Sequence, residues 1–460
     1  MQILVKKGKE EDVQGGLVVK FTAAKQGEQK FVQTSFAAQI LEVGIGQAAE
    51  VTAEAIREAT GIAVAFTQKL SLKMSIICDG GEHHIDRGFA IAEALLLATY
   101  VYDTYKKPKT QLGDVTLLCA DARQVVRIEK GVARAAERNL GITLARNLVN
   151  APPHDIHPEQ LAQTARDIAK ASKGRVKAKI LERVDCEKLG MGAFLAVAQG
   201  SAYAPKFIHL TYTPTKPSKS SLAIVGKGIT FDSGGLSLKP SASMATMKCD
   251  MGGAAAVLGL FSVITTLAPR YTVHGIIAAA ENMPSGTAYR PGDIVRSANG
   301  KTIEVLDTDA EGRMTLADAL DYATKLLPTA IVDLATLTGA CIVGLGEEIA
   351  GLMCNDEALA VSLLAAAERA GEKLWEMPLE KRYRALLESD VADIRQIATS
   401  RYGGSLTAGL FLQEFVGTFP WAHLDIAGPA FAERPMSSYI GKGGTGYGVR
   451  TLVEFVQAFK

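Results

Sequence analysis

The sequence predicts an α/β protein with two domains. A smaller N-terminal α/β domain is expected to precede a C-terminal domain whose mixed, mostly parallel sheet is sandwiched by helices. Two observations favour this class. The chain has 460 residues, more than one ordinary hydrophobic core accommodates. Short apolar stretches typical of strands also alternate along it with longer stretches typical of helices.

The N-terminal domain is predicted over residues 1–127. It contains two strand-like stretches, "MSIICDG" at 74–80 and "DVTLLCA" at 114–120, with a helical stretch between them at 87–105. A strand, a helix and a second strand in this order are typical of an α/β fold.

A linking segment is predicted over residues 128–153. Helix-forming residues at 128–149 run into "NAPPHDIHP". Pro152 and Pro153 must stop a helix there, because proline lacks the backbone N–H and restricts the residue before it. We therefore place the domain boundary at this segment.

The second domain, predicted over residues 154–460, has the more apolar strands. They are expected at 221–226, 272–280, 330–336 and 422–428, with helical segments between them. Continuous apolar strands of this kind are typical of a parallel sheet that is covered on both faces. Such sheets bind ligands at the carboxyl ends of their strands, so charged residues that follow the strands are the first candidates for a functional site.

Composition and charge argue against several classes of function. The formal net charge is +1, and no long lysine or arginine block suggests a nucleic-acid or membrane partner. The N-terminal residues lack an apolar region with a cleavage site, and we find no uninterrupted apolar run long enough to span a bilayer. Six single cysteines without a CxxC pair are expected to be reduced core residues. These observations predict a cytoplasmic protein.

Four carboxylates follow the predicted strands of the second domain. Asp232 lies in "VGKGITFDSGG", Asp250 precedes a helix of small residues, and Asp309 and Glu311 lie in "LDTDAEGRMTLADAL". Asp250 and Asp309 could each be simple helix N-caps. Unpaired burial of all four carboxylates would, however, be prohibitive, and two divalent cations would balance their charge. Mg²⁺, Mn²⁺ and Zn²⁺ accept oxygen ligands of this kind.

Two other kinds of site are less consistent with the sequence. The seven histidines lie outside these clusters and HExxH is absent, which disfavours a histidine-based zinc protease. His423, inside an apolar strand, is expected to be a core histidine. The stretch "GKGGTG" at 441–446 matches GxGxxG but follows no clear strand, so a nucleotide-binding loop is weakly supported.

Several segments resemble, in order, the signature segments of the leucine (cytosol) aminopeptidase family. They are "VGKGITFDSGG", "MKCDMGGAAAV", "ENMPSGTAYRPGDIVRSANGKTIEVLDTDAEGRMTLADAL", "DLATLTGA" and "WAHLDIAG". The resemblance covers about residues 140–460 and implies a metal-dependent aminopeptidase that acts through a water bridged by two metal ions. It also implies a macro-domain-like N-terminal fold and a homohexamer built as a dimer of trimers.

The resemblance also assigns the residues of the reaction. It implies two metal ions, one held tightly and one more exchangeable, and the exchangeable ion would lie on Asp232, Asp309 and Glu311. It implies catalytic roles for Lys239, which would stabilise the oxyanion, and for Arg313, which would hold a bicarbonate ion that shuttles the proton. Mn²⁺ or Zn²⁺ is expected, with Mg²⁺ as a further candidate at the exchangeable site. The implied ligands are Lys227, Asp232, Asp250, Asp309 and Glu311.

The family's substrate pocket maps onto four residues. Met247, Thr336, Gly339 and Ala427 would surround the side chain of the first substrate residue and favour leucine-like groups. Their alternative role is ordinary core packing. A free substrate α-amine can ligate a metal ion whereas an acylated amine cannot, so internal peptide bonds should be rejected.

The sequence departs from the family at two positions. Asp307 replaces the usual asparagine and Met314 the usual leucine. Met314 conserves volume and should matter little. Asp307 adds negative charge close to Asp309, and would alter metal preference unless it is only a turn residue.

Two other functions stay open at this stage. A phosphoesterase could use the same pair of ions but would cleave phosphate esters. A DNA-binding or scaffolding particle would tolerate the loss of metal ligands, yet none of the implied ligands is missing here.

Overall fold

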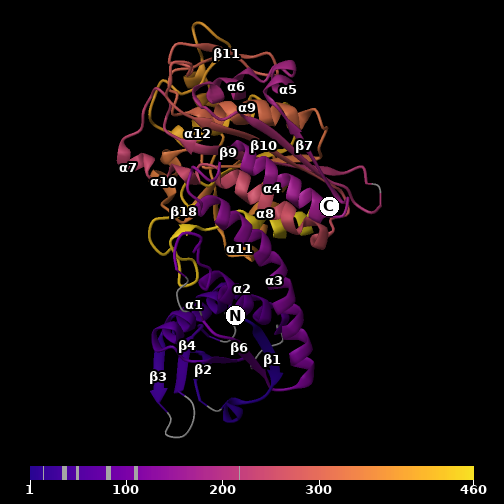
Figure 1. The fold of residues 1–460 in the computed structure, drawn as a ribbon, viewed down its shortest axis with the longest axis vertical. Coiled ribbons are helices and arrows are strands. Elements are labelled where there is room, and N and C mark those ends of the chain that lie inside the picture. The colour runs from indigo at the N-terminus through magenta and orange to yellow at the C-terminus, as the bar shows by residue number, and fades with distance from the viewer. Residues whose placement is uncertain are drawn as a thin grey trace. The chain divides into compact units, whose positions relative to one another are not determined.

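The computed structural model describes residues 1–13, 15–33, 39–47, 51–78, 84–107, 112–216 and 218–459. Their contacts divide the chain into two compact units, coloured along the chain in Figure 1. The N-terminal unit consists of Met1–Leu140 and Glu433–Lys442, and the C-terminal unit of Gly141–Ala432 and Gly443–Lys460. Each unit contains a sheet with helices, which confirms the predicted two-domain α/β class.

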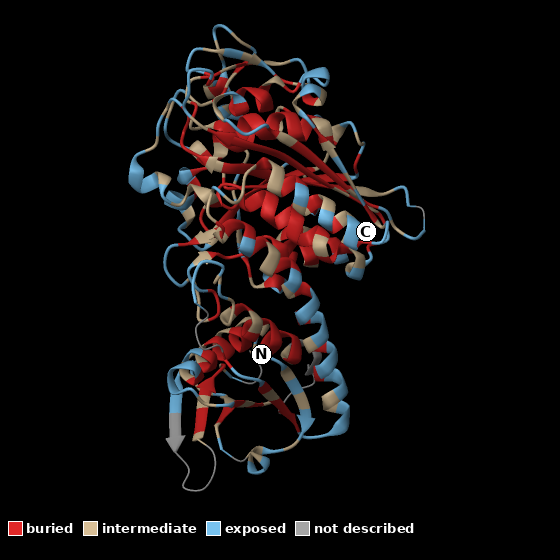
Figure 2. Cartoon of the chain, viewed as in Figure 1, coloured by how far each residue is buried: buried red, intermediate tan, exposed pale blue. Residues whose placement is uncertain are grey.

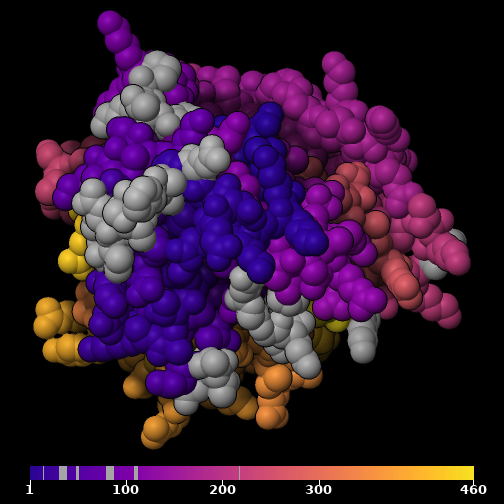
Figure 3. Space-filling view, turned by 90° about the horizontal axis from the view of Figure 1, so that it is seen from below, coloured from indigo at the N-terminus to yellow at the C-terminus, as the bar shows by residue number. Residues whose placement is uncertain are grey.

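In the described residues, the N-terminal unit is built on a six-stranded sheet with the order β1-β6-β5-β2-β4-β3, in which β3 and β4 pair antiparallel and the other neighbours pair parallel. Figure 3 looks at this unit from below, with the start of the chain in indigo. The macro-domain likeness stays a prediction. The elements are β1 (Ile3–Lys7), η1 (Glu10–Asp12), β2 (Leu17–Thr22), β3 (Gln29–Gln33), β4 (Gln39–Gly44), α1 (Ala53–Leu70), β5 (Met74–Ile77), α2 (His84–Ala98) and β6 (Val115–Cys119).

The predicted elements of this unit are present, with one difference in length. Strands β5 and β6 fall within the predicted stretches 74–80 and 114–120, but α2 ends at Ala98, whereas the helix was predicted to reach residue 105. The residues after Ala98 read Thr-Tyr-Val-Tyr. β-Branched and aromatic side chains lose rotamer freedom in a helix, which favours an end at this point.

Residues 433–442 pack on α1 although they come from the far end of the sequence. Ser438 Oγ donates to the carbonyl oxygen of Glu58 at 2.7 Å, and the Tyr439 hydroxyl donates to Glu54 Oε1 at 2.7 Å. Gly61 allows this approach, because a Cβ there would lie 2.3 Å from Ser438 Oγ. The N-terminal unit is therefore completed by a segment that no local pattern assigns to it.

Helix α3 (Ala122–Asn150) contains the helix that was predicted at 128–149. It continues without interruption through the boundary between Leu140 and Gly141, so the contact boundary falls inside a helix. The helix ends just before Pro152 and Pro153, as their lack of a backbone N–H requires.

The C-terminal unit is built on an eight-stranded sheet with the order β15-β14-β17-β13-β9-β10-β8-β7. Its four central strands, β17, β13, β9 and β10, are mutually parallel, whereas β8, β7 and β14 are joined antiparallel. This confirms the mixed, mostly parallel sheet. The strands are β7 (Val176–Leu181), β8 (Lys206–Tyr212), β9 (Ser221–Asp232), β10 (Thr272–Asn282), β13 (Ala330–Ala335), β14 (Ile349–Cys354), β15 (Lys373–Glu376) and β17 (Trp421–Asp425).

Helices cover both faces of this sheet, with α6, α9 and α12 on one side and α4, α8 and α11 on the other (Figure 1). The central strands and α8 are almost wholly buried (Figure 2). The helices are α4 (Pro158–Ala171), α5 (Arg183–Lys188), α6 (Gly192–Val197), η3 (Ala198–Gly200), α7 (Ser241–Met244), η4 (Met247–Cys249), α8 (Gly252–Leu267), α9 (Glu311–Thr324), α10 (Gly339–Leu345), α11 (Glu357–Ala370), η5 (Lys381–Leu387), α12 (Gly404–Gln413) and α13 (Val449–Ala458). The smaller sheets contain β11 (Ile294–Arg296), β12 (Thr302–Glu304), β16 (Ile394–Arg395), β18 (Phe431–Ala432) and β19 (Gly443–Gly444).

One segment of the C-terminal unit meets the length and composition of a membrane span. Residues Ser241–Leu267 are long and apolar enough, whereas no such run was predicted from the sequence. However, 78% of the most apolar window is buried inside the unit. Burial of α8 against β9, β10 and β13 accounts for this composition. The segment is therefore explained as a helix of the hydrophobic core, and it gives no evidence of a membrane span.

Candidate metal centre

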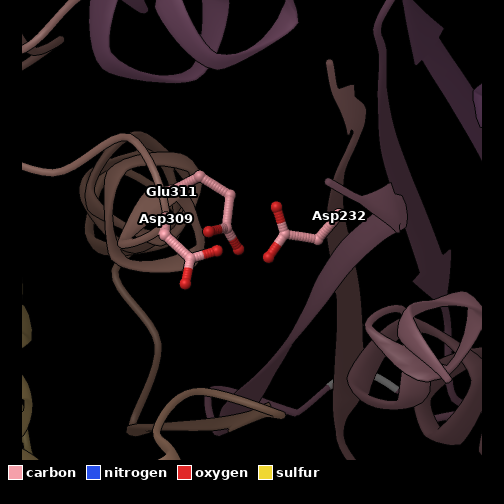
Figure 4. Close-up of side chains that lie close together, drawn as sticks. All are labelled: Asp232, Asp309 and Glu311. Atoms are coloured by element: carbon pink, nitrogen blue, oxygen red, sulfur yellow. The ribbon is translucent and has the colours of Figure 1, made fainter. Parts of the chain in front are cut away.

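Four acidic side chains converge where the central strands end. Asp232 is the last residue of β9, Asp309 lies two residues before α9, Glu311 is the first residue of α9, and Asp250 lies between η4 and α8. Figure 4 shows the carboxylates of Asp309 and Glu311 facing that of Asp232 across a common space. One oxygen from each of these three groups lies within 4.8 Å of the others. The parallel strands thus bring residues far apart in sequence to one edge of the sheet.

Lys227 lies in the middle of β9 and is 3% exposed. Its Nζ is 2.7 Å from Asp250 Oδ1 and 2.8 Å from Glu311 Oε1, and it donates to the carbonyl oxygen of Thr336 at 2.9 Å. Burial alone would lower the pKa of Lys227, but the charges of Asp250 and Glu311 raise it above its ordinary value. A cation bound to these carboxylates would therefore have to replace a proton on Lys227.

Lys239 makes a second set of ion pairs on the other side of the cluster. Its Nζ lies 2.9 Å from Asp232 Oδ2 and also contacts Asp309 Oδ1. Burial opposes the charged form, yet the two carboxylates raise the pKa of Lys239 above its usual value. Lys239 is consequently a cation at neutral pH that faces the same space as the acidic groups.

The cluster contains more acidic than basic groups. Four carboxylates and two lysines carry a net charge of −2 if all are ionised. Burial, with the charge of Glu311, raises the pKa of Asp232 to about 6, and burial raises the pKa of Asp250 well above its usual value. Asp250 Oδ2 is buried without a hydrogen-bond partner among the described residues. Oxygen donors with unmet charge fit divalent cations.

Close packing around Lys227 depends on Gly312. A Cβ at Gly312 would lie 2.4 Å from Lys227 Cε and 2.7 Å from Nζ. The first turn of α9 can therefore lie directly over the lysine only because residue 312 has no side chain. This contact places Glu311 within reach of Lys227 Nζ.

Asn282 orients Asp232 and was not predicted from the sequence. Its Nδ2 donates to Asp232 Oδ1 at 2.8 Å and to the carbonyl oxygen of Thr308 at 2.9 Å. Asn282 is fully buried at the end of β10, next to the end of β9. Its place after an apolar strand is the signal that could have identified it.

Arg313 lies two residues beyond Glu311 and is 8% exposed. Its Nη1 donates to the carbonyl oxygen of Gln396 at 2.9 Å, whereas its Nε is buried without a hydrogen-bond partner among the described residues. Burial lowers the pKa of Arg313 to about 10, which leaves the guanidinium charged at neutral pH. An unpartnered N–H on a buried cation suits an anionic ligand.

The four residues predicted to form the substrate pocket come from three stretches of the chain. Thr336 follows β13 and donates from Oγ1 to Asp250 Oδ1 at 2.8 Å, so it adjoins the carboxylates. Gly339 begins α10, and Ala427 follows β17. The loops after β13 and β17 meet at Asp425, whose Oδ1 accepts hydrogen bonds from the backbones of Thr338 and Ala427. Met247 begins η4, three residues before Asp250. Their contact with substrate stays a prediction.

Asp307 and Met314 take ordinary structural roles. Asp307 Oδ1 accepts a hydrogen bond from the backbone N–H of Asp309 at 2.9 Å, a turn that an asparagine oxygen could make equally. Met314 is fully buried in the core of the C-terminal unit, as expected for a volume-conserving replacement. His423 is also buried, with Nδ1 2.6 Å from Asp333 Oδ1, which confirms it as a core histidine.

Comparisons with known proteins agree with this architecture. Residues 143–453 match the catalytic domain of the cytosol aminopeptidase family, and residues 22–109 match its N-terminal domain. A probable cytosol aminopeptidase of Synechococcus sp. (strain JA-3-3Ab) is 51% identical over 434 residues, covering 91% of this chain and 84% of the relative. Another from Persephonella marina (strain DSM 14350 / EX-H1) is 44% identical, with 91% and 84% covered.

Two solved structures share the fold over almost the whole chain. A mutant of tomato leucine aminopeptidase superimposes with a TM-score of 0.89 at 35% identity, covering 99% of this chain and 96% of its own. A bottromycin maturation enzyme in complex with Mn superimposes with a TM-score of 0.87 at 36% identity, covering 96% and 99%. With both of its domains matched and the carboxylate cluster in place, this chain belongs to the cytosol aminopeptidase family of metal-dependent hydrolases.

Proposed function

We propose that this aminopeptidase prefers peptides with a leucine-like first residue and acts with two divalent cations. The observation that carries the proposal is the buried cluster of four carboxylates and two lysines, in which oxygens of Asp232, Asp309 and Glu311 lie within 4.8 Å of one another. A related bottromycin maturation enzyme was solved with Mn, which supports Mn²⁺ as the first ion to test, with Zn²⁺ and Mg²⁺ as alternatives.

The residues that would hold the ions are the five predicted from the sequence. One ion would take Lys227, Asp232, Asp250 and Glu311, and the more exchangeable ion Asp232, Asp309 and Glu311. Lys227 would have to lose its proton, so ion binding would release a proton and weaken as the pH falls. When bound, two such ions polarise a peptide carbonyl and lower the pKa of water enough to supply a nucleophile near neutral pH.

Lys239 and Arg313 would serve the reaction as fixed charges. The Lys239 ammonium, 14% exposed at its side chain, would stabilise the negative charge that develops on the carbonyl oxygen of the substrate. Arg313 has no acceptor atom and stays charged, so it cannot act as a base. Its unpartnered Nε–H would hold a bicarbonate ion, which can carry the proton from water to the leaving amine.

The preference for leucine-like residues would come from the loops beside Asp250. Thr336, Gly339, Ala427 and Met247 surround the amino-terminal residue of the substrate in this proposal. Their small or apolar side chains would accommodate an aliphatic group and exclude charged ones. The protein would act in the cytoplasm as a homohexamer, a dimer of trimers, with no membrane or nucleic-acid partner.

Hydrolysis of a leucyl anilide by metal-stripped protein tests the proposal. Turnover should return on adding Mn²⁺ or Zn²⁺, and the N-acetylated anilide should not be cleaved. Glu311→Gln is expected to lower kcat by about 100-fold or more, because it removes a carboxylate shared by both ions.

Two results would contradict the proposal. One is equal cleavage of the acetylated anilide, which would remove the requirement for a free amine. The other is cleavage of p-nitrophenyl phosphate without cleavage of the leucyl anilide, which would show that the site is a phosphoesterase. Comparing leucyl with lysyl anilide tests the side-chain preference separately.

A further inference from the structure

Gln396 is a fully buried polar residue that lies directly after β16, about 85 residues beyond Asp309 and Glu311. Its backbone N–H donates to the carbonyl oxygen of Glu304 at 2.9 Å, which extends the parallel pairing of β12 and β16. The side chain therefore starts from a fixed backbone and points toward the loop 305–310 that joins β12 to α9. This loop carries Asp309 and leads into Glu311.

The side-chain amide of Gln396 forms hydrogen bonds with backbone groups at both ends of that loop. Its Oε1 accepts hydrogen bonds from the backbone N–H groups of Leu306 and Asp307, each at 3.2 Å. Its Nε2 donates to the carbonyl oxygen of Ala310 at 3.0 Å. Only a group with a donor and an acceptor at this reach can make all three bonds, because a carboxylate cannot donate to Ala310 and an apolar side chain can do neither.

The backbone of the same residue holds Arg313. The carbonyl oxygen of Gln396 accepts the hydrogen bond from Arg313 Nη1 at 2.9 Å. This bond fixes one edge of the guanidinium and leaves Nε–H without a partner among the described residues. Gln396 thus contacts the loop 305–310 through its side chain and Arg313 through its backbone carbonyl.

We infer that Gln396 is a positioning residue that couples the ion-binding loop to Arg313. The inference rests on the proposed function, since it concerns how that site is held. Gln396 does not touch the ions or the substrate in this account. It keeps the carboxylates of Asp309 and Glu311 in a fixed position relative to the guanidinium of Arg313. Cation binding by the carboxylates and anion binding by the arginine therefore depend on the same loop conformation.

The test variant is Gln396→Met, which keeps the length of the side chain and adds no charge. Titration calorimetry of metal-stripped protein with Mn²⁺ should show the weaker binding event weakened by about 10- to 100-fold, the range seen when residues that orient metal ligands are replaced. With saturating Mn²⁺, kcat for the leucyl anilide should fall at least about 10-fold while KM changes less than about twofold, because substrate contacts remain.

Asp393→Ala is the matched control. Asp393 is exposed, and its Oδ2 accepts hydrogen bonds from the N–H and hydroxyl of Thr302 at the other end of the same small sheet. It should disturb β12 and β16 without changing Mn²⁺ affinity. Gln396→Asn, which keeps the amide on a shorter side chain, should restore part of the lost affinity.

The outcomes separate this inference from the proposed function. Unchanged Mn²⁺ affinity and kcat in Gln396→Met, with active wild-type protein, would overturn the positioning role alone. Equal losses in Gln396→Met and Asp393→Ala would also overturn it, since they would show a general effect of loosening the sheet. Wild-type protein that neither binds Mn²⁺ nor cleaves the anilide would overturn the proposed function and this inference with it.

Discussion

At the residue scale, the acidic cluster shows how a glycine, Gly312, makes room for the buried charge of Lys227. The first turn of α9 lies against Lys227 because residue 312 is a glycine. In most helices a glycine costs about 0.5–1 kcal/mol relative to alanine, because it loses more conformational freedom on folding. Here the glycine permits a close approach, because a Cβ at residue 312 would lie 2.4 Å from Lys227 Cε and would force the buried lysine to shift.

Gly312→Ala should therefore destabilise the protein, against the usual trend for helices. Overpacking of this kind costs about 1–3 kcal/mol, and displacement of Lys227 should also weaken Mn²⁺ binding. Urea unfolding of metal-stripped protein measures the first effect and calorimetric titration the second.

Gly344→Ala is the matched control for this prediction. Gly344 lies in α10, and apart from its own helix backbone a Cβ there would meet no heavy atom of the described residues within 4 Å. It should leave stability unchanged or raise it by up to about 1 kcal/mol. A stabilising Gly312→Ala would show that the lysine can move away at no cost.

At the element scale, α9 spans two polar environments. It begins with Glu311 in the acidic cluster, and near its end Tyr322 OH lies 3.1 Å from His209 Nδ1. His209 in β8 and His274 in the neighbouring β10 are linked by a 3.0 Å hydrogen bond between Nε2 and Nδ1. Burial lowers the pKa of both imidazoles to about 4, with a smaller contribution at His209 from the charges of His274 and Lys179.

This histidine pair should make the protein sensitive to acid. The folded pKa values near 4 lie below the ordinary histidine value of 6.5, so the unfolded chain binds more protons than the folded chain between pH 6.5 and pH 4. Stability is therefore expected to fall as the pH drops from about 6.5 to about 4, by about 2 kcal/mol for each histidine. Urea unfolding between pH 7 and 4.5 should show a smaller loss in His209→Gln than in the wild type.

His154→Gln is the control for the acid effect, because the His154 side chain is 72% exposed. It should follow the wild-type profile. The comparison between variants matters because the acidic cluster also titrates in this range, and burial raises the pKa of Asp232 to about 6. Identical profiles for wild type and His209→Gln would contradict the prediction.

Also at the element scale, the sequence predicted the parts of the site that follow strands or lie in continuous motifs. The end of β9 and the start of α9 were indicated by apolar runs and by the charges beside them, whereas Asn282 at the end of β10 was missed. Gln396 was not predicted, because it acts through hydrogen bonds to backbone groups about 85 residues away, and such bonds have no periodic signal. The early end of α2 was missed because apolar aromatic residues continue beyond it.

At the scale of the whole molecule, the acidic cluster belongs entirely to the C-terminal unit. A ligand that binds only the folded state stabilises it by about 2.7 kcal/mol at 100 times its Kd. Ion binding should therefore raise the unfolding temperature of the C-terminal unit and leave that of the N-terminal unit unchanged.

Calorimetric unfolding of metal-stripped and Mn²⁺-loaded protein checks this expectation. Two transitions should appear, of which only one moves with Mn²⁺. Glu311→Gln should abolish most of the shift, because it removes a carboxylate from the cluster. An equal shift of both transitions, or of neither, would contradict the assignment of the ions to this cluster.

The sequence predicted that the chain has two units, but not all of the residues that each unit contains. Alternation of strands and helices indicated a domain on each side of α3. The inclusion of residues 433–442 in the N-terminal unit depends on contacts such as that of Ser438 with α1, and these are tertiary rather than local. The segment does contain Pro435, but a single proline does not indicate which unit the segment packs against.

That segment has a consequence for how the chain can be taken apart. Because the N-terminal unit uses residues from near both ends of the sequence, no single cut yields two complete units. A fragment ending at Leu140 would expose the surface of α1 around Gly61 that Ser438 and Tyr439 otherwise cover. Fusion partners, truncations and exchanges of domains between relatives would therefore have to carry residues 433–442 along with the N-terminal unit, as an inserted loop rather than as a simple tail.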